Sequence, residues 1–172
     1  MVQVGRPAPL FNLEAYFNGK FERIALDKLR GKWVVLFFYP ADFTFICPTE
    51  ITEFSKHIKD FEKLNAVVLG CSTDSVHAHK AWMKELGEVK YPLLSDMTHA
   101  TSRDYGVLIE DKGIALRGTY IIDPEGVVRI QLVHDNSVGR SVSECLRVLE
   151  GLQTGERCPV EWKPGQKTLG KD

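Results

Sequence analysis

The sequence lacks the features that define several large classes of protein. No apolar run approaches the roughly 18 residues that a membrane-spanning helix requires. The first residues, Met1–Pro7, contain no apolar core of a secretory signal peptide. The formal net charge of −1 predicts no strong attraction to nucleic acids or anionic membranes. We therefore expect a protein of the cytoplasm.

Cysteine is scarce, and the spacing of the cysteines does not indicate a disulfide-bonded fold. The 172 residues include four cysteines, none of them in a Cys-x-x-Cys pair: Cys47, Cys71, Cys145 and Cys158. Four cysteines are too few for a secreted, disulfide-stapled scaffold of this length. The absence of Cys-x-x-Cys also argues against a dithiol oxidoreductase of the thioredoxin class. In a reducing compartment each cysteine is either a core thiol or a reactive group.

The remaining composition is that of one globular domain with a full core. Hydrophobic residues make up 44% of the chain and charged residues 26%. Residues 9–24 alternate loosely around Asn18-Gly19, a pattern that predicts a β-hairpin. The apolar runs 33–39 and 66–71 predict two buried strands. Helical spacing of apolar residues between these runs, at Ile51, Phe54, Ile58 and Phe61, predicts a βαβ unit with parallel strands.

The second half of the chain predicts further elements around the same sheet. Residues 75–86 favour a helix, and residues 120–130 favour two strands joined by a turn at 123–126. Ser141 begins a helix that extends to Leu152, with Glu144 completing a capping box. The expected fold class is α/β, a central mixed sheet flanked by helices, with an N-terminal hairpin extension and an antiparallel second half. We expect a domain at 1–154 and an extended C-terminal tail at 155–172.

Cys47 stands where a loop meets a helix. Pro48 suits the first helical position, so the thiol is placed near the positive end of the helix dipole, which stabilises a thiolate. Thr44, three residues earlier, has a hydroxyl that could turn toward the sulfur and donate to a bound peroxide. The alternative is a partly buried cysteine at a helix start, with Thr44 as its cap. Local features leave both readings open.

The other cysteines and the histidines have simpler explanations. Cys71 lies in an apolar strand and Cys145 on the apolar stripe of the last helix, so both are expected to be inert core thiols. His77 and His79 are two residues apart on a helix and point in different directions, which predicts no shared metal ligation. His57 would support a Cys-His hydrolase only through a spatial contact with Cys47. We expect no metal and no organic cofactor.

Several segments together resemble the peroxiredoxins of the typical two-cysteine subgroup, which includes the peroxidase component of bacterial alkyl hydroperoxide reductase. The stretch from Phe38 to Glu50 is similar to the family motif Pro-x-x-x-Thr/Ser-x-x-Cys. Cys158–Gly165 is similar to the motif around the second, resolving cysteine. The matching segments extend over almost the whole chain and also include 117–123 and 138–141.

The resemblance implies a thioredoxin-like fold, a homodimer and often a ring of five dimers. It makes Cys47 the peroxidatic cysteine, which attacks hydrogen peroxide or an organic hydroperoxide and becomes a sulfenic acid. It makes Cys158 of the partner subunit the resolving cysteine, which forms a disulfide with Cys47. A thioredoxin-like protein or a flavoprotein disulfide reductase then restores both thiols. The remaining site residues that it implies are Pro40 as a shield from water, Thr44 and Arg117 beside the sulfur, and Glu50 with Arg140 as a supporting ion pair.

Ionisation alone does not explain a fast peroxidase. Lowering an ordinary thiol's pKa from about 8.5 to about 6 raises its thiolate fraction only about 30-fold at pH 7. The rest must come from alignment of the O–O bond and stabilisation of charge on the leaving oxygen. A non-enzymatic chaperone or scaffold built on the same ring is the alternative function. It predicts that Cys47→Ser leaves the main function intact.

The resemblance also bears on over-oxidation. Some family members carry a Gly-Gly-Leu-Gly insertion and a C-terminal helix ending near Tyr-Phe, which cover the active-site helix. Residues 84–92 contain no such insertion, and the sequence printed here has only 14 residues after Cys158. We therefore expect an enzyme that resists conversion of its sulfenic acid to sulfinic acid.

Overall fold

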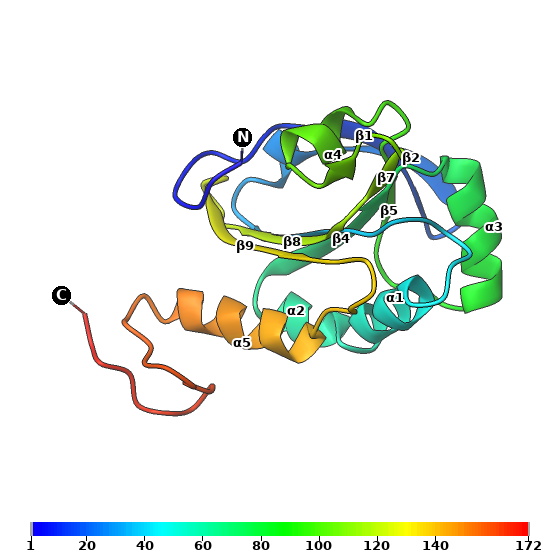
Figure 1. Cartoon of the computed structure of the whole chain (residues 1–172). Helices are drawn as coiled ribbons and strands as arrows, with labels where there is room; N and C mark the ends of the chain where they lie inside the picture. The colour runs from blue at the N-terminus through cyan, green and yellow to red at the C-terminus, as the bar shows by residue number, and fades with distance from the viewer. Residues whose placement is uncertain (1, 172) are drawn as a thin grey trace. The chain divides into compact units, whose positions relative to one another are not determined.

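A computed structural model of the chain describes residues 2–171. They belong to two compact units, Met1–Arg140 and Ser141–Asp172 (Figure 1). The strands of the first unit are β1 (Asn12–Phe17), β2 (Lys20–Ala25), β3 (Trp33–Phe38), β4 (Ala66–Ser72), β5 (Leu93–Ser95), β6 (Leu108–Ile109), β7 (Ile114–Ala115), β8 (Arg117–Ile122) and β9 (Val128–His134). Its helices are η1 (Leu26–Leu29), α1 (Cys47–Lys56), α2 (Ile58–Lys63), α3 (Val76–Leu86) and α4 (Ala100–Asp104). The second unit contains α5 (Val142–Gln153).

Seven strands of the first unit form one mixed sheet in the order β2-β1-β5-β4-β3-β8-β9. β3, β4 and β5 are parallel, whereas β8 and β9 are antiparallel to their neighbours. This arrangement confirms the predicted βαβ unit and the antiparallel second half. β6 and β7 pair separately as a two-stranded ribbon. The pattern did not predict β5, β6, β7 or α4, all of which are too short to show a clear period.

The central strand β3 is buried on both faces because helices cover both sides of the sheet. On one face the ring of Phe37 stacks on Phe54 of α1, with the ring centroids 4.4 Å apart. On the other face Phe38 contacts Tyr105, which follows α4, with the centroids 5.3 Å apart. The sequence of this strand is a continuous apolar run. Because the strand is buried on both faces, apolar and polar residues do not alternate along it.

The predicted hairpin is confirmed. β1 and β2 pair antiparallel, with Phe17 opposite Lys20 across the turn. Asn18 and Gly19 both adopt positive φ, at 48° and 75°, as a two-residue turn that matches the twist of the strands requires.

The region after Cys47 folds as two helices rather than one. α1 ends at Lys56, and the backbone of His57 leaves helical geometry before α2 begins at Ile58. The side chain of His57 bridges the break by contacting Glu53 and Asp60. Pro48 is the second residue of α1, one position later than predicted, and Ile46 rather than Thr44 is the N-cap. Proline is tolerated there because the first N–H groups of a helix have no partner within it.

The second unit confirms the capped helix but not the extended tail. The Ser141 hydroxyl accepts from the backbone N–H of Glu144, as a capping box requires, although the Glu144 carboxylate binds Arg147 instead of returning to Ser141. Beyond α5 the chain folds back on itself, because Arg157 exchanges backbone hydrogen bonds with Leu169 and Gly170. Trp162 is only 3% exposed. The prediction of an extended tail with little core-forming power is wrong, because the segment folds back on itself and buries an aromatic side chain.

No helix among residues 2–171 is both long and apolar enough to cross a bilayer.

The stacking of Phe37 on Phe54 gives a test of the core. We expect Phe54→Ala to lower the free energy of unfolding by about 3–5 kcal/mol, because it deletes a fully buried ring and leaves a cavity. Urea unfolding at a fixed protein concentration measures the change. Lys59→Ala, an exposed residue on the adjacent helix, is the control and should change the stability by less than about 0.5 kcal/mol. Equal effects of the two substitutions would contradict the packing described here.

Candidate active site

Cys47 is the first residue of α1 and is completely buried. The chain enters the helix through Ile46, whose carbonyl oxygen accepts from the backbone N–H groups of Thr49 and Glu50. The sulfur therefore lies in the first turn, at the positive end of the α1 dipole. This position stabilises a negative charge on the sulfur. The predicted placement of Cys47 at a loop–helix junction is confirmed.

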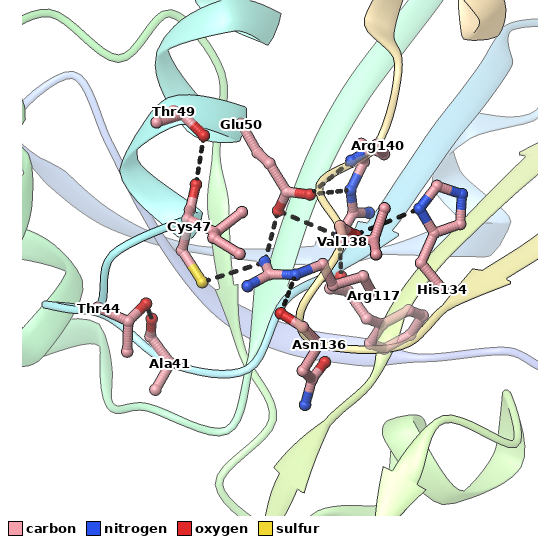
Figure 2. Close-up of polar contacts among 12 residues, drawn as sticks. Ala41, Thr44, Cys47, Thr49, Glu50, Arg117, His134, Asn136, Val138 and Arg140 are labelled. Carbon is pink, nitrogen blue, oxygen red and sulfur yellow. Dashed lines mark hydrogen bonds and ion pairs between the residues drawn. The ribbon is translucent and has the colours of Figure 1, made fainter.

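A guanidinium group is the polar partner of the sulfur. Arg117 begins β8, and its Nη1 lies 3.3 Å from the Cys47 Sγ (Figure 2). The same Nη1 donates to Glu50 Oε2 at 2.8 Å, and Nε donates to the carbonyl oxygen of Asn136 at 3.0 Å. Cys47 and Arg117 are 70 residues apart in sequence, so only the sheet brings them together.

Glu50 and Arg140 complete a buried ion cluster beneath the sulfur. Glu50 Oε1 accepts from both the Nε and the backbone N–H of Arg140, each at 3.0 Å. Arg140 also donates to the carbonyl oxygens of Phe38 and Gly118, and its guanidinium carbon lies 4.9 Å from the centre of the Phe37 ring. Arg140 thus links three strand and helix segments, which fixes its own position and that of Glu50.

The charges of this cluster balance only when Cys47 is ionised. The side chains of Glu50, Arg117 and Arg140 are 4% exposed or less. Two guanidinium groups and one carboxylate sum to +1. A buried charge without a counterion is costly, and a thiolate on Cys47 brings the sum to zero. The cluster therefore places a net positive charge beside the Cys47 sulfur.

Thr44 lies on the opposite side of the sulfur from Arg117 (Figure 2). Its hydroxyl donates to the carbonyl oxygen of Ala41 at 2.9 Å. With its proton engaged in this way, the hydroxyl oxygen offers lone pairs to the site and accepts rather than donates. Pro40 is buried at the end of β3, between the strand and the loop that leads to Cys47.

A buried hydrogen-bond network that the sequence did not reveal anchors this loop. Asp42 accepts from the Tyr39 hydroxyl at 2.8 Å and lies 2.7 Å from His79 Nδ1. The other ring nitrogen of His79 donates to the Leu94 carbonyl oxygen at 2.9 Å. Burial and the neighbouring Asp42 raise the pKa of Tyr39, so the phenol remains a donor. Phe43, the next residue, is held at φ 57°, a strained value for a non-glycine residue.

The remaining cysteines lie in different environments. Cys71 is completely buried, which confirms its core position, and burial together with Asp96 raises the pKa of its thiol well above the usual value. Cys145 is 6% exposed, also in agreement with a core position. Cys158 is partly exposed in the second unit, where its sulfur lies 3.7 Å from the Thr154 hydroxyl and 3.8 Å from the Gly151 carbonyl oxygen.

The histidines support neither of the other sites that were considered. His57 contacts Glu53 and Asp60, and Arg117 rather than a histidine is the partner of Cys47, so a Cys-His hydrolase receives no support. His77 packs against Phe21 while His79 points into the core, so the two rings diverge as predicted. Within residues 2–171 no group of three or more potential metal ligands occurs.

Known proteins share this architecture. Residues 4–131 match the model of the AhpC/TSA family. The chloroplastic 2-Cys peroxiredoxin BAS1 of Spinacia oleracea is 51% identical over 180 residues, which cover 98% of this chain and 68% of that protein. The reduced 2-Cys peroxiredoxin of Plasmodium vivax superposes with a TM-score of 0.93 at 40% identity, over 96% of this chain and 91% of that one. AhpC of Enterococcus faecalis gives a TM-score of 0.87 at 36% identity, over 92% and 100%.

The matches cover almost the whole chain at identities far above those at which only a fold is shared. The fold is thioredoxin-like, as it is in those relatives. The chain belongs to the AhpC/TSA family and is a two-cysteine peroxiredoxin, a thiol-dependent peroxidase.

Proposed function

We propose that Cys47 is the peroxidatic cysteine, with Arg117, Thr44 and Pro40 completing the site and Glu50 and Arg140 supporting it. The observation that carries the proposal is the charge balance beneath the sulfur. Glu50 and the two arginines leave one buried positive charge, and Arg117 Nη1 reaches Cys47 Sγ at 3.3 Å. Among residues 2–171, the charged group that acts on Cys71 is instead the carboxylate of Asp96.

The first step is the transfer of one oxygen to sulfur. The Cys47 thiolate attacks the terminal oxygen of a hydroperoxide, an S–O bond forms, and the O–O bond breaks. The electron pair leaves with the distal oxygen, which takes up a proton and departs as water or an alcohol. Arg117 donates to the oxygens as charge develops on them. The Thr44 oxygen accepts the peroxide's O–H, which aligns the O–O bond with the sulfur.

The second step uses Cys158 of the partner subunit. Its thiol condenses with the Cys47 sulfenic acid, which forms a disulfide and releases water. Cys47 is completely buried, and a disulfide needs the two Cα atoms within about 7 Å of each other. The first turn of α1 therefore has to unwind before the disulfide forms. A thioredoxin-like protein or a flavoprotein disulfide reductase then returns both cysteines to thiols.

We propose a homodimer, and a ring of five dimers, as the assembly in which this exchange occurs. β9 is the last strand of the described sheet, and its neighbouring residues Leu132 and Val133 are 44% and 38% exposed. An edge of this kind accommodates the same edge of a second copy. Phe43 and Phe21 are about half exposed and supply a separate apolar surface for contacts between dimers.

We place the protein in the cytoplasm. The four cysteines are too few for the disulfide scaffold of a secreted protein of this length, which supports this proposal.

Serine substitutions separate the roles of the four cysteines. We expect Cys47→Ser to abolish peroxide consumption, because a serine hydroxyl is not ionised at neutral pH. Cys158→Ser should keep the first oxidation, measured by stopped-flow with one equivalent of peroxide, but stop turnover with a disulfide reductase. Cys71→Ser and Cys145→Ser are the controls and should change stability more than rate. Loss of peroxide reduction in Cys71→Ser but not in Cys47→Ser would refute the assignment.

Substitution of Arg117 by lysine tests whether the guanidinium group is needed for the reaction with peroxide. We expect Arg117→Lys to lower the second-order rate constant for peroxide by about 100-fold, because an ammonium group cannot reach Cys47, Glu50 and Asn136 together. Rapid-mixing kinetics under single-turnover conditions measure the change. Arg103→Lys is the matched control, since Arg103 also pairs with a glutamate, Glu110, but is exposed. A rate constant within twofold of the parent protein's would remove Arg117 from the site.

A non-reducing gel tests whether the disulfide joins Cys47 to Cys158 of the partner subunit. Peroxide-treated protein should migrate as a covalent dimer that disappears on reduction, and each single variant Cys47→Ser and Cys158→Ser should stay monomeric on the gel. A 1:1 mixture of the two variants should give a dimer with one disulfide, because each supplies the cysteine that the other lacks. A disulfide confined to monomers would contradict the intersubunit exchange.

A further inference from the structure

The segment that follows β9 is an ordered turn, although most of its residues are exposed. We call residues Asp135–Arg140 the 135–140 turn. Asp135 Oδ1 accepts from the backbone N–H of Ser137 at 2.8 Å and from the Ser137 hydroxyl at 2.6 Å. The backbone N–H of Val138 donates to the Asp135 carbonyl oxygen at 3.1 Å. The hydrogen bonds from Ser137 lower the pKa of Asp135, so its carboxylate is ionised at neutral pH.

This turn contacts the buried ion cluster at three points. The main-chain carbonyl of Asn136 accepts from Arg117 Nε at 3.0 Å, and the backbone N–H of Arg140 donates to Glu50 Oε1 at 3.0 Å (Figure 2). Between them, Gly139 lies against the start of α1. A Cβ at Gly139 would lie 3.3 Å from Ile46 Cγ2 and 3.8 Å from Glu50 Oε1. The turn therefore approaches the residue before Cys47 closely enough that a side chain at position 139 would displace Ile46.

We propose that the 135–140 turn is the positioning element that orients the Arg117 guanidinium toward the peroxide, through the Asn136 carbonyl. The proposal rests on the function assigned to Cys47 and Arg117 above. Glu50 and Cys47 both contact Arg117 at Nη1, and contacts at one nitrogen leave the planar group free to pivot about that nitrogen. The Asn136 carbonyl adds a second contact at Nε and so fixes the plane.

With Nε and Nη1 both held, one part of the guanidinium remains available. Within residues 2–171, Nη2 of Arg117 has no hydrogen-bond partner, whereas Nη1 donates to both Glu50 and Cys47. The orientation of the fixed plane therefore decides where the Nη2 hydrogens point. Donors held in place before the reaction stabilise the leaving oxygen without the cost of reorganising. Asp135 and Gly139 act through this geometry and are positioning residues, since neither touches the sulfur.

Two substitutions at Asp135 form a matched pair. Asp135→Ala removes the acceptor of both Ser137 hydrogen bonds and loosens the turn. Asp135→Asn keeps an Oδ1 acceptor at the same place. We expect Asp135→Ala to lower the second-order rate constant for hydrogen peroxide about 10-fold, and Asp135→Asn to restore most of it.

A second readout separates orientation from ionisation or misfolding. Iodoacetamide alkylates the Cys47 thiolate without an oxygen leaving group, so its rate reports the thiolate and access to it. In Asp135→Ala the alkylation rate should stay within twofold of the parent protein's. The loss of rate should also be smaller with a peracid than with hydrogen peroxide, because a carboxylate leaving group needs less stabilisation.

Gly139 tests the same turn from its other end. Gly139→Ala introduces the 3.3 Å contact with Ile46 Cγ2 and should slow the peroxide reaction about 10-fold. Ile46→Ala removes that methyl group, so the double variant should recover most of the rate lost in Gly139→Ala. Recovery in the double variant identifies the contact itself, rather than a general loss of stability, as the cause.

The outcomes distinguish this proposal from the function on which it rests. If Cys47→Ser keeps both peroxide reduction and rapid alkylation, the proposed function fails, whatever the turn does. If Cys47 is required but Asp135→Ala reacts with peroxide as fast as the parent protein, the positioning role is wrong. It is equally wrong if peroxide and alkylation rates fall by the same factor, or if Asp135→Asn is as slow as Asp135→Ala.

Discussion

The site depends on the ion pairs that the Glu50 carboxylate forms with two buried guanidinium groups. This carboxylate accepts from Arg117 at 2.8 Å and from the side chain and backbone of Arg140 at 3.0 Å. Without this carboxylate, two buried cations would repel each other in a medium that screens charge poorly. With it, the cluster carries one positive charge directly beneath Cys47. The helix start, the strand β8 and the turn after β9 are thereby joined at one point.

Two equally buried cysteines lie beside charges of opposite sign. Cys47 and Cys71 are both completely buried. Cys47 has the Arg117 guanidinium at 3.3 Å and lies at a helix N-terminus. Burial raises the pKa of the Cys71 thiol, and the neighbouring carboxylate of Asp96 raises it further. The sign of the nearest charge therefore distinguishes the two environments, and this difference is the basis of the role proposed for Cys47.

The two sides of the site are held differently. Arg117 begins a buried strand, and the loop that carries Thr44 is anchored through Asp42 to His79 and Tyr39. Cys47, by contrast, lies in the first turn of α1, where helical hydrogen bonds are fewest. This difference suits the proposed mechanism, in which the first step needs fixed donors and the second needs the sulfur to leave its pocket.

Short-range patterns predicted the elements well but not their ends or smallest members. The apolar run at 33–39 and the turn residues Asn18-Gly19 fixed a strand and a hairpin, because sterics and burial act locally there. The break at His57 and the three-residue β5 left no periodic signal. The folded tail was missed because its order depends on one buried side chain, Trp162, within a polar segment.

The sequence alone determined that Cys47 stands where a loop meets a helix after a buried strand, and the motifs around it indicated, by resemblance, the family and the residues expected beside Cys47. Only the tertiary structure decided which charges face the sulfur. Glu50 meets Arg117 across 67 residues and Arg140 across 90, and these contacts follow from the order of strands in the sheet. Hydrophobic periodicity specifies which face of a strand is buried but not which strand lies beside it. The Asp42–His79 contact and the anchoring of Arg117 by Asn136 therefore became visible only in the folded chain.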